Sequence, residues 1–206
     1  MTASNNTFDF DHPPIDPVAA CAHWFEQAKK LPLANPNAMT LCTVGADGHP
    51  SSRIVLLRGF DDQGAVFYTN RESRKGLALA AHPRASLLFH WDEDPIGRQI
   101  NIEGAVTFTS DAQSDAYWLT RPRESQISAC ASAQSNPIAN RAAMQRAQES
   151  VEAKFAGQNV PRPPHWGGYR VALERIELWQ GNKFRSHDRM VYTRAGSGWH
   201  AQRLCP

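Results

Sequence analysis

The residues best suited to chemistry in this sequence are arginines and lysines that lie beside predicted turns and strand ends. A guanidinium group can pair with two oxygens of a phosphate or carboxylate at once, so the set indicates an anionic ligand. Ser73-Arg74-Lys75 also opens a predicted helix, whose free N–H groups and dipole favour an anion. Any one of these cations could be an ordinary surface residue; the set as a whole is harder to explain that way. Its members are Arg53, Arg58, Arg74, Lys75, Arg121, Arg123, Arg185 and Arg189.

Other kinds of site are excluded by missing motifs. The sequence has no glycine-rich dinucleotide fingerprint, no P-loop, no H-E-x-x-H and no G-x-S-x-G. Its four cysteines (Cys21, Cys42, Cys130 and Cys205) are scattered without a C-x-x-C pair, so we expect reduced thiols and no bound metal. A net charge of +2 gives no reason to expect a nucleic acid or a membrane surface as partner.

The length and the first residues indicate one domain in the cytoplasm. The 206 residues are enough for a single domain of ordinary size. No stretch approaches the roughly 20 apolar residues that cross a bilayer, and the polar N-terminus does not resemble a secretory signal. We expect a flexible arm over residues 1–15 and a single domain over residues 16–206.

The predicted elements form an α+β fold built on an antiparallel barrel. Short strands separated by tight turns are typical of such barrels. A helix beginning at Asp16-Pro17 has a good N-cap and a proline in its first turn. We expect further helices at 73–82, 111–119 and 137–155. The expected strands are 39–45, 52–59, 65–70, 85–91, 98–109 and 169–181, with a closing hairpin over 190–204.

Several segments together identify a family resemblance. They are SSRIVLLRGFDDQGAVFYTNRESRKG, RQINIEG, SDAYWLTRPRESQ, ASAQS, RPPHWGGYR and IELWQGNKFRSHDR. In order and spacing they are similar to the pyridoxine/pyridoxamine 5′-phosphate oxidase family, from about residue 16 to Pro206. The resemblance implies an FMN-binding split β-barrel with peripheral helices. It also implies a homodimer with FMN at its interface, and oxidation of a small-molecule substrate with O₂ as final acceptor.

The resemblance also implies which residues bind FMN. Arg53 is expected at the FMN phosphate, with the backbone that follows it along the flavin ring and Arg74 and Lys75 as a phosphate clamp. Trp179 could instead be a core residue, and Gln99 an ordinary outward one. The full implied set is Arg53, Ile54, Val55, Leu56, Leu57, Arg58, Tyr68, Thr69, Ser73, Arg74, Lys75, Gln99, Gln134, Ser135, Trp179 and Arg189.

A second implied set binds the substrate: Arg58, Tyr117, Arg121, Ser125, Arg185, Ser186 and His187. Arg185 and His187 are the expected catalytic pair over the substrate ring, where His187 acts either as a base or as a positioning hydrogen-bond donor. One difficulty is local. Strict strand alternation sends Arg53 and Arg58 to opposite faces, so both can reach one site only if the strand twists or bulges or if the second subunit is involved.

Departures from the family pattern leave three functions open. Arg58 replaces the usual lysine, Ser186 the usual leucine, Asn101 an arginine and Cys130 a tryptophan, and the N-terminal arm lacks the family's Arg-x-x-Tyr segment. The first hypothesis is a pyridoxamine/pyridoxine 5′-phosphate oxidase. The second is a sister oxidase that aromatises reduced phenazine carboxylic acids, since arginines suit a carboxylate as well as a phosphate. The third is a flavin- or pyridoxal-phosphate-binding module without turnover.

Overall fold

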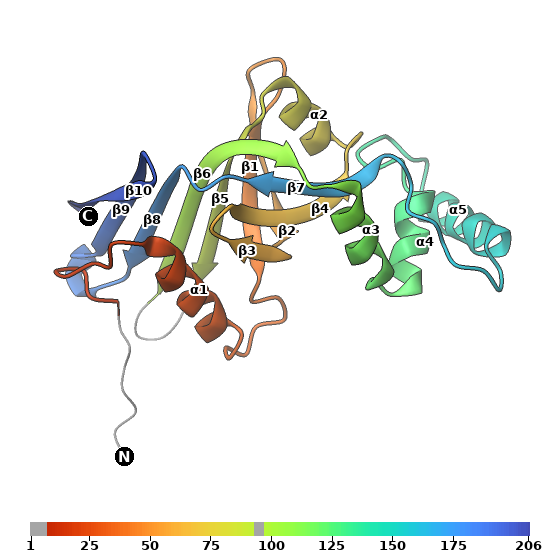
Figure 1. Cartoon of the computed structure of the whole chain (residues 1–206). Helices are drawn as coiled ribbons and strands as arrows, with labels where there is room; N and C mark the ends of the chain where they lie inside the picture. Colours follow the sequence, from red (N-terminus) through yellow and green to blue (C-terminus); the bar gives the residue numbers. More distant parts are fainter. Residues whose placement is uncertain (1–7, 93–96) are drawn as a thin grey trace.

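The computed structural model describes residues 8–92 and 97–206, and within them the strands join into one curled, ten-stranded antiparallel sheet (Figure 1). The main path runs β10-β9-β8-β6-β5-β1-β2, while β7 joins the far end of β6 to β4, which pairs with β3. The strands are β1 Ala38–Val44, β2 Pro50–Leu56, β3 Gly59–Asp61, β4 Gly64–Asn70, β5 Arg84–Trp91, β6 Arg98–Phe108, β7 Trp166–Val171, β8 Arg175–Gln180, β9 Asp188–Ala195 and β10 Gly198–Leu204. The expected α+β antiparallel fold is confirmed.

The long strand β6 produces the curl. Residues 98–103 pair with β8, whereas Val106, Thr107 and Phe108 pair with β7 on the other side of the bend. Gly104 lies at the crossing, where an added Cβ would come within 2.0 Å of the Ala172 carbonyl oxygen. A glycine is therefore required there for the two parts of the sheet to meet.

Five α-helices decorate the sheet in the described part of the chain. They are α1 Pro17–Ala28, α2 Arg74–Ala81, α3 Asp111–Leu119, α4 Arg123–Ala131 and α5 Arg141–Lys154. Helices α3, α4 and α5 gather at one end of the sheet, and the β8-β9-β10 strands lie at the other (Figure 1). The Asp16 side chain caps α1, as the sequence predicts, and the Ser110 side chain caps α3, where the sequence left Ser110 and Asp111 as alternatives.

The core lies inside the curled sheet. Leu41, Phe67, Leu87, Ile100 and Ile176 are fully buried in one large cluster. A smaller cluster of Trp118, Ile127, Val160 and Trp166 fastens α3 and α4 to the start of β7. Burial of these side chains, at roughly 25 cal/mol per Å² of apolar surface, holds the helical end against the sheet.

Some of the expected elements differ from those in the structure. The segment 169–181 forms two strands, because the chain breaks at 172–174 to pass from one part of the sheet to the other. The helix expected from residue 137 begins only at Arg141, where the Asn140 side chain accepts a hydrogen bond from the Ala143 N–H. Helix α4 was not expected, and it begins directly after Pro122.

The N-terminal segment also differs from the expectation. Residues 1–7 lie outside the described residues, so that part of the predicted flexible arm is not tested. Phe8 and Phe10 pack edge-to-face at 4.7 Å, and Phe10 is 7% exposed within the core. Residues 8–15 are therefore not a free arm along their whole length. No helix in the described ranges is long and apolar enough to span a membrane.

Candidate functional site

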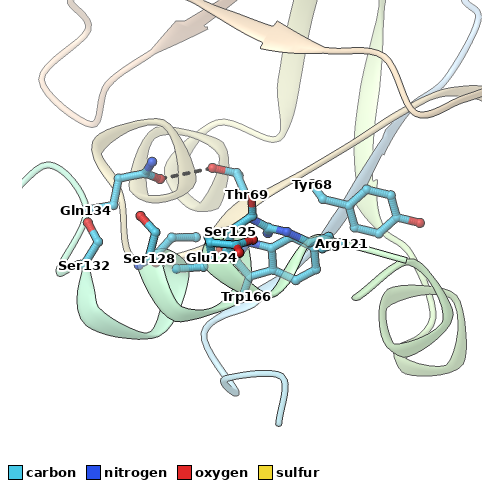
Figure 2. A pocket seen from close by; sticks show the side chains of 11 residues that line it. Tyr68, Thr69, Arg121, Glu124, Ser125, Ser128, Ser132, Gln134 and Trp166 are labelled. Carbon is cyan, nitrogen blue, oxygen red and sulfur yellow. Dashed lines mark hydrogen bonds between the residues drawn. The ribbon is translucent and has the colours of Figure 1, made fainter. Parts of the chain in front are cut away.

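A cleft of about 450 Å³ lies between the edge of β2, strand β4 and helices α3 and α4. A second hollow of about 400 Å³ continues it along α4. Figure 2 shows this continuation, with Thr69 and Gln134 pointing toward one another and the α4 serines beside them. Eleven of the sequence-predicted residues line the first cleft: Ile54, Val55, Leu56, Arg58, Tyr68, Thr69, Lys75, Tyr117, Arg121, Ser125 and Gln134.

The chain changes sheet partner between Arg53 and Arg58, which removes the alternation difficulty. Strand β2 pairs with β1 as far as Leu56, and the Leu57 N–H still bonds to the Asn37 carbonyl at 2.9 Å. The Arg58 N–H bonds instead to the Val66 carbonyl of β4 at 2.8 Å. Arg58 therefore lines the cleft. Arg53 does not line it, but lies close enough to Lys75, at one end of the cleft, to lower the pKa of Lys75.

A cluster of cations without a carboxylate partner lies at one end of the cleft. The Lys75 ammonium donates only to neutral oxygens: Gln134 Oε1 at 3.1 Å, Ser73 Oγ at 3.2 Å and Thr69 Oγ1 at 3.3 Å. Burial, and then the nearby Arg53 guanidinium, lower the pKa of Lys75 to about 8. Burial, and then Arg74, lower the pKa of Arg53. Positive charges held together in this way favour a bound anion.

Ser73 supports this cluster from behind. Its side chain is fully buried, donates to the Asn70 carbonyl at 2.7 Å and accepts from the Gly76 N–H at the start of α2. The hydroxyl therefore caps the helix and holds Lys75, and does not face the cleft as a direct ligand. Ser135 and Arg74 lie on a neighbouring hollow beyond Gln134, where Ser135 has a φ of 76°.

The other end of the cleft is aromatic. The rings of Tyr68 and Tyr117 stack at 4.1 Å, and Tyr68 stacks on Trp166 at 5.5 Å. The Arg121 guanidinium lies 4.6 Å from the Trp166 ring, and burial lowers the pKa of Arg121. Trp166 was not predicted as a site residue from the sequence; it lies beside Gly167-Gly168 in the RPPHWGGYR segment. A Cβ on Gly167 would lie 2.4 Å from the Arg71 guanidinium, so the glycine leaves room for that side chain.

Arg58 and Arg121 are held toward this end without counter-charges. Arg58 lies 5.7 Å from the Tyr117 ring, and Arg121 donates to the Ser125 carbonyl at 2.9 Å. Neither forms an ion pair with a described residue, whereas Arg162 and Arg170 each have an aspartate partner. The cleft therefore offers two separate places for an anion, one at Arg53 and Lys75 and one at Arg58 and Arg121.

The remaining predicted residues lie at the opposite end of the sheet. Gln99, Trp179 and Arg189 are direct cross-strand partners on β6, β8 and β9, so their side chains share one face. Trp179 is only half-buried, so its interpretation as a core residue is wrong. Arg189 is already engaged by Glu177 at 2.7 Å. This row does not line the cleft described above.

The loop after β8 places His187 and Arg185 beside that row. The His187 ring lies 4.7 Å from Trp179, and its Nδ1 accepts the Asn182 N–H at 3.1 Å. Because Nδ1 accepts, the neutral ring carries its proton on Nε2, which is then a donor. This arrangement favours the positioning role over the base. Arg185 and Ser186 are exposed and lie on the same loop.

The Lys75 ammonium makes anion binding dependent on pH. Its charge is present below a pKa of about 8 and is lost as pH rises through that value. We therefore expect the affinity of flavin-free protein for FMN to fall about tenfold between about pH 7 and 9.5, because the dianionic phosphate loses one cationic partner. Fluorescence titration of FMN measures this, and Lys75→Arg is expected to flatten the profile. An equal fall in Lys75→Arg would contradict the assignment.

Two family models, both named for the same kind of oxidase, together match most of the chain. Residues 25–155 match the family model described as "Pyridoxamine 5′-phosphate oxidase", and residues 166–206 match "Pyridoxine 5′-phosphate oxidase C-terminal dimerisation region". The chain belongs to the pyridoxamine 5′-phosphate oxidase family. This membership confirms the resemblance seen in the sequence.

Relatives named "Pyridoxine/pyridoxamine 5′-phosphate oxidase" support an oxidase of this family's type. The protein from Rubrobacter xylanophilus is 51% identical over 93% of this chain and 87% of its own length. The one from Myxococcus xanthus strain DK1622 is 50% identical over 94% of this chain and 93% of its own length.

Solved structures in the family share the fold. PhzG from Burkholderia lata 383, solved with tetrahydrophenazine-1-carboxylic acid, is 31% identical. Its TM-score is 0.89, over 99% of this chain and all of PhzG. A pyridoxamine 5′-phosphate oxidase-related, FMN-binding protein from Nostoc punctiforme has a TM-score of 0.72 at 17% identity, over 96% of this chain and all of that protein. The split-barrel fold is confirmed, and the family points to a flavin cofactor.

Proposed function

We propose that this protein is an FMN-dependent oxidase that converts pyridoxamine 5′-phosphate or pyridoxine 5′-phosphate to pyridoxal 5′-phosphate with O₂ as acceptor. The observation that carries the proposal is the pair of anion sites in one cleft. The cofactor and the substrate each carry a phosphate. Each phosphate would have its own cations, which form no ion pair with a carboxylate among the described residues. The identity of about 50% to relatives named as oxidases of these substrates supports the same assignment.

The residues present fit FMN. Lys75 at one end of the cleft, with Arg53 near it and Arg74 near Arg53, concentrates positive charge for a phosphate. Ile54, Val55 and Leu56 form one wall of the cleft between that end and Arg58. Thr69 and Gln134 supply neutral polar groups beside the cations. A phosphate at one end of an elongated, partly apolar ligand matches this order of groups.

A homodimer explains why the other predicted residues lie apart. Gln99, Trp179, Arg189, Arg185 and His187 form a half-site at the far end of the same sheet. All of them except Gln99, which lies on β6, belong to the region that matches a dimerisation model. We infer that the far-end half-site of one protomer closes the cleft of the other, with FMN between them.

The chain's own residues bind and orient the substrate in this mechanism. Arg58 and Arg121 hold its phosphate, while the Tyr117 ring and the Ser125 region bound that end of the cleft. Arg185 and His187 of the second protomer lie over the substrate ring, where His187 Nε2 donates a hydrogen bond. FMN, when bound, would supply the acceptor for a hydride equivalent, with O₂ as the final acceptor that is reduced to peroxide. With pyridoxamine 5′-phosphate the oxidised substrate would be an imine, which water would hydrolyse to the aldehyde with release of ammonia.

A reduced phenazine carboxylic acid is the second candidate substrate. It is favoured by the similarity to PhzG and by a further hollow of about 470 Å³ that shares Arg58 and Tyr117 with the cleft. Phe25, Pro36 and Phe60 line that hollow, so it could accommodate part of a larger ring system. The relatives named as oxidases give no support to a module without turnover.

An oxidase assay tests the proposal. Purified protein containing FMN is mixed with pyridoxamine 5′-phosphate or pyridoxine 5′-phosphate in air, and pyridoxal 5′-phosphate is measured. Pyridoxamine and pyridoxine without phosphate are the matched controls and are expected to react at least about tenfold less efficiently, because Arg58 and Arg121 lose their anion. Turnover of a reduced phenazine acid with none of the phosphates would favour the second candidate.

A further inference from the structure

The Phe184 side chain is 98% exposed, more than any other large hydrophobic side chain in the described part of the chain. It lies at the tip of the loop between β8 and β9, next to Arg185. A single exposed apolar residue is common on protein surfaces. This one differs because its backbone is also in an unfavourable conformation.

Phe184 and Arg185 are consecutive left-handed residues. Their φ angles are 58° and 61°, in the region that favours glycine because a Cβ crowds the backbone. Backbone strain of this kind persists only where the surroundings impose it, and it concentrates at functional sites. Both side chains are exposed.

The base of the loop is firmly held. Asn182 Nδ2 donates to Asp188 Oδ2 at 2.6 Å, and the Asn182 N–H donates to His187 Nδ1 at 3.1 Å. The Ser186 N–H closes the turn on the Lys183 carbonyl at 3.2 Å. These hydrogen bonds fix the base of the loop. They therefore also fix the positions of Phe184, Arg185 and His187 relative to one another.

The partner for this tip is a second copy of the chain. The loop belongs to the region that matches the dimerisation model, and it does not line its own protomer's cleft. The cleft already contains Arg58 and Arg121, so Lys183 and Arg185 would add further positive charge to it. A bound anionic ligand would offset the repulsion between these like charges. The family's apolar residue between the arginine and the histidine is Ser186 here, so an apolar contact is missing from that position.

We propose that Phe184 of one protomer is a specificity-determining residue that packs against the aromatic ring of a substrate bound in the cleft of the other. The inference rests on the proposed function, since it takes the substrate and the dimer from there. Phe184 supplies the apolar surface that Ser186 lacks, and Arg185 beside it supplies the charge. A substrate with an aromatic ring and an anionic substituent matches both the apolar surface of Phe184 and the charge of Arg185.

The test compares Phe184→Ala and Phe184→Leu with Ile138→Ala. Ile138 is a matched apolar control that is 53% exposed and lies outside the loop and the cleft. Each FMN-containing protein is titrated with pyridoxal 5′-phosphate, and KM and kcat are measured with pyridoxamine 5′-phosphate. Phe184→Ala is expected to raise Kd and KM about tenfold with kcat within about twofold, because it removes apolar contact area. Phe184→Leu is expected to recover most of this loss.

Two results would overturn the inference. One is Phe184→Ala with the same Kd and KM as Ile138→Ala. The other is loss of the dimer or of flavin with Kd and KM unchanged, which would show a purely structural contact. Arg185→Ala separates this inference from the proposed function. If Arg185→Ala lowers turnover and Phe184→Ala changes nothing, only the role of Phe184 fails. If the wild type binds pyridoxal 5′-phosphate through Phe184 but oxidises neither phosphate, only the proposed reaction fails.

Discussion

Lys75→Ala is expected to weaken FMN binding by about 10- to 100-fold, the loss typical of a charge-assisted hydrogen bond to a partly buried phosphate. The Lys75 ammonium donates hydrogen bonds to the side chains of Thr69, Ser73 and Gln134 at the end of the cleft. The protein is expected to leave purification largely without yellow colour, and titration with FMN measures the remaining affinity. Arg74→Ala is expected to give a smaller loss, because Arg74 is exposed.

The matched control is Lys30→Ala, a change of the same type at an exposed residue outside the cleft. It is expected to retain FMN like the wild type. Lys75→Arg tests whether charge alone suffices, since a guanidinium keeps the charge but changes the reach. Full retention of flavin by Lys75→Ala would remove Lys75 from the phosphate site.

Mixing two inactive variants is expected to restore activity. Arg121→Ala damages the cleft, and Arg185→Ala damages the loop at the far end of the sheet. If each site combines the cleft of one protomer with the loop of the other, a mixed dimer contains one intact site and one doubly damaged site. Random exchange of equal amounts is expected to recover about a quarter of the wild-type activity, because half of the dimers are mixed.

Co-expression with two different affinity tags allows the mixed dimers to be isolated and their activity measured. The control is a mixture of Arg58→Ala with Arg121→Ala, two changes in the same cleft, which is expected to restore nothing. No recovery in the first mixture, despite mixed dimers, would contradict the division of the site between protomers. Recovery in both mixtures would contradict the placement of Arg58 and Arg121 in one cleft.

Local signals in the sequence predict much of the fold correctly. Asp16-Pro17 and Ser110 mark helix starts because a side-chain oxygen can satisfy a free backbone N–H, and both caps are present. Helix α4 was missed because the segment has weak apolar periodicity, and only Ile127 of its residues is buried. The break between β7 and β8 depends on how distant strands pair, which alternation within 169–181 does not encode.

The candidate site could also be predicted from the sequence only in part. The cations of the cleft could be predicted as anion ligands from residue type, and the structure places Arg58, Lys75 and Arg121 in its lining, with Arg53 close to Lys75. The bend after Leu57 was not predictable from alternation, because it follows from a change of strand partner. Ser73 was expected as a ligand, but the sequence does not show that its hydroxyl is used by the backbone of α2.

The choice between the two roles of His187 required a contact that only the structure shows. The sequence left a base and a hydrogen-bond donor open, and the contact from the Asn182 N–H to Nδ1 favours the donor. Trp179, Arg185, His187 and Arg189 lie away from the cleft, in the region that matches the dimerisation model. Their role in the site stays a prediction that depends on the proposed dimer. The cytoplasmic location stays a prediction.

Anaerobic flavin reduction tests the central claim most directly. The yellow protein is mixed with pyridoxamine 5′-phosphate or pyridoxine 5′-phosphate without oxygen, and the flavin absorbance is followed. The proposed function predicts rapid bleaching with one substrate oxidised per flavin, followed by return of the colour and continued formation of pyridoxal 5′-phosphate when air is admitted. A flavin that stays oxidised with both phosphates, but bleaches with a reduced phenazine carboxylic acid, would contradict the assigned substrate.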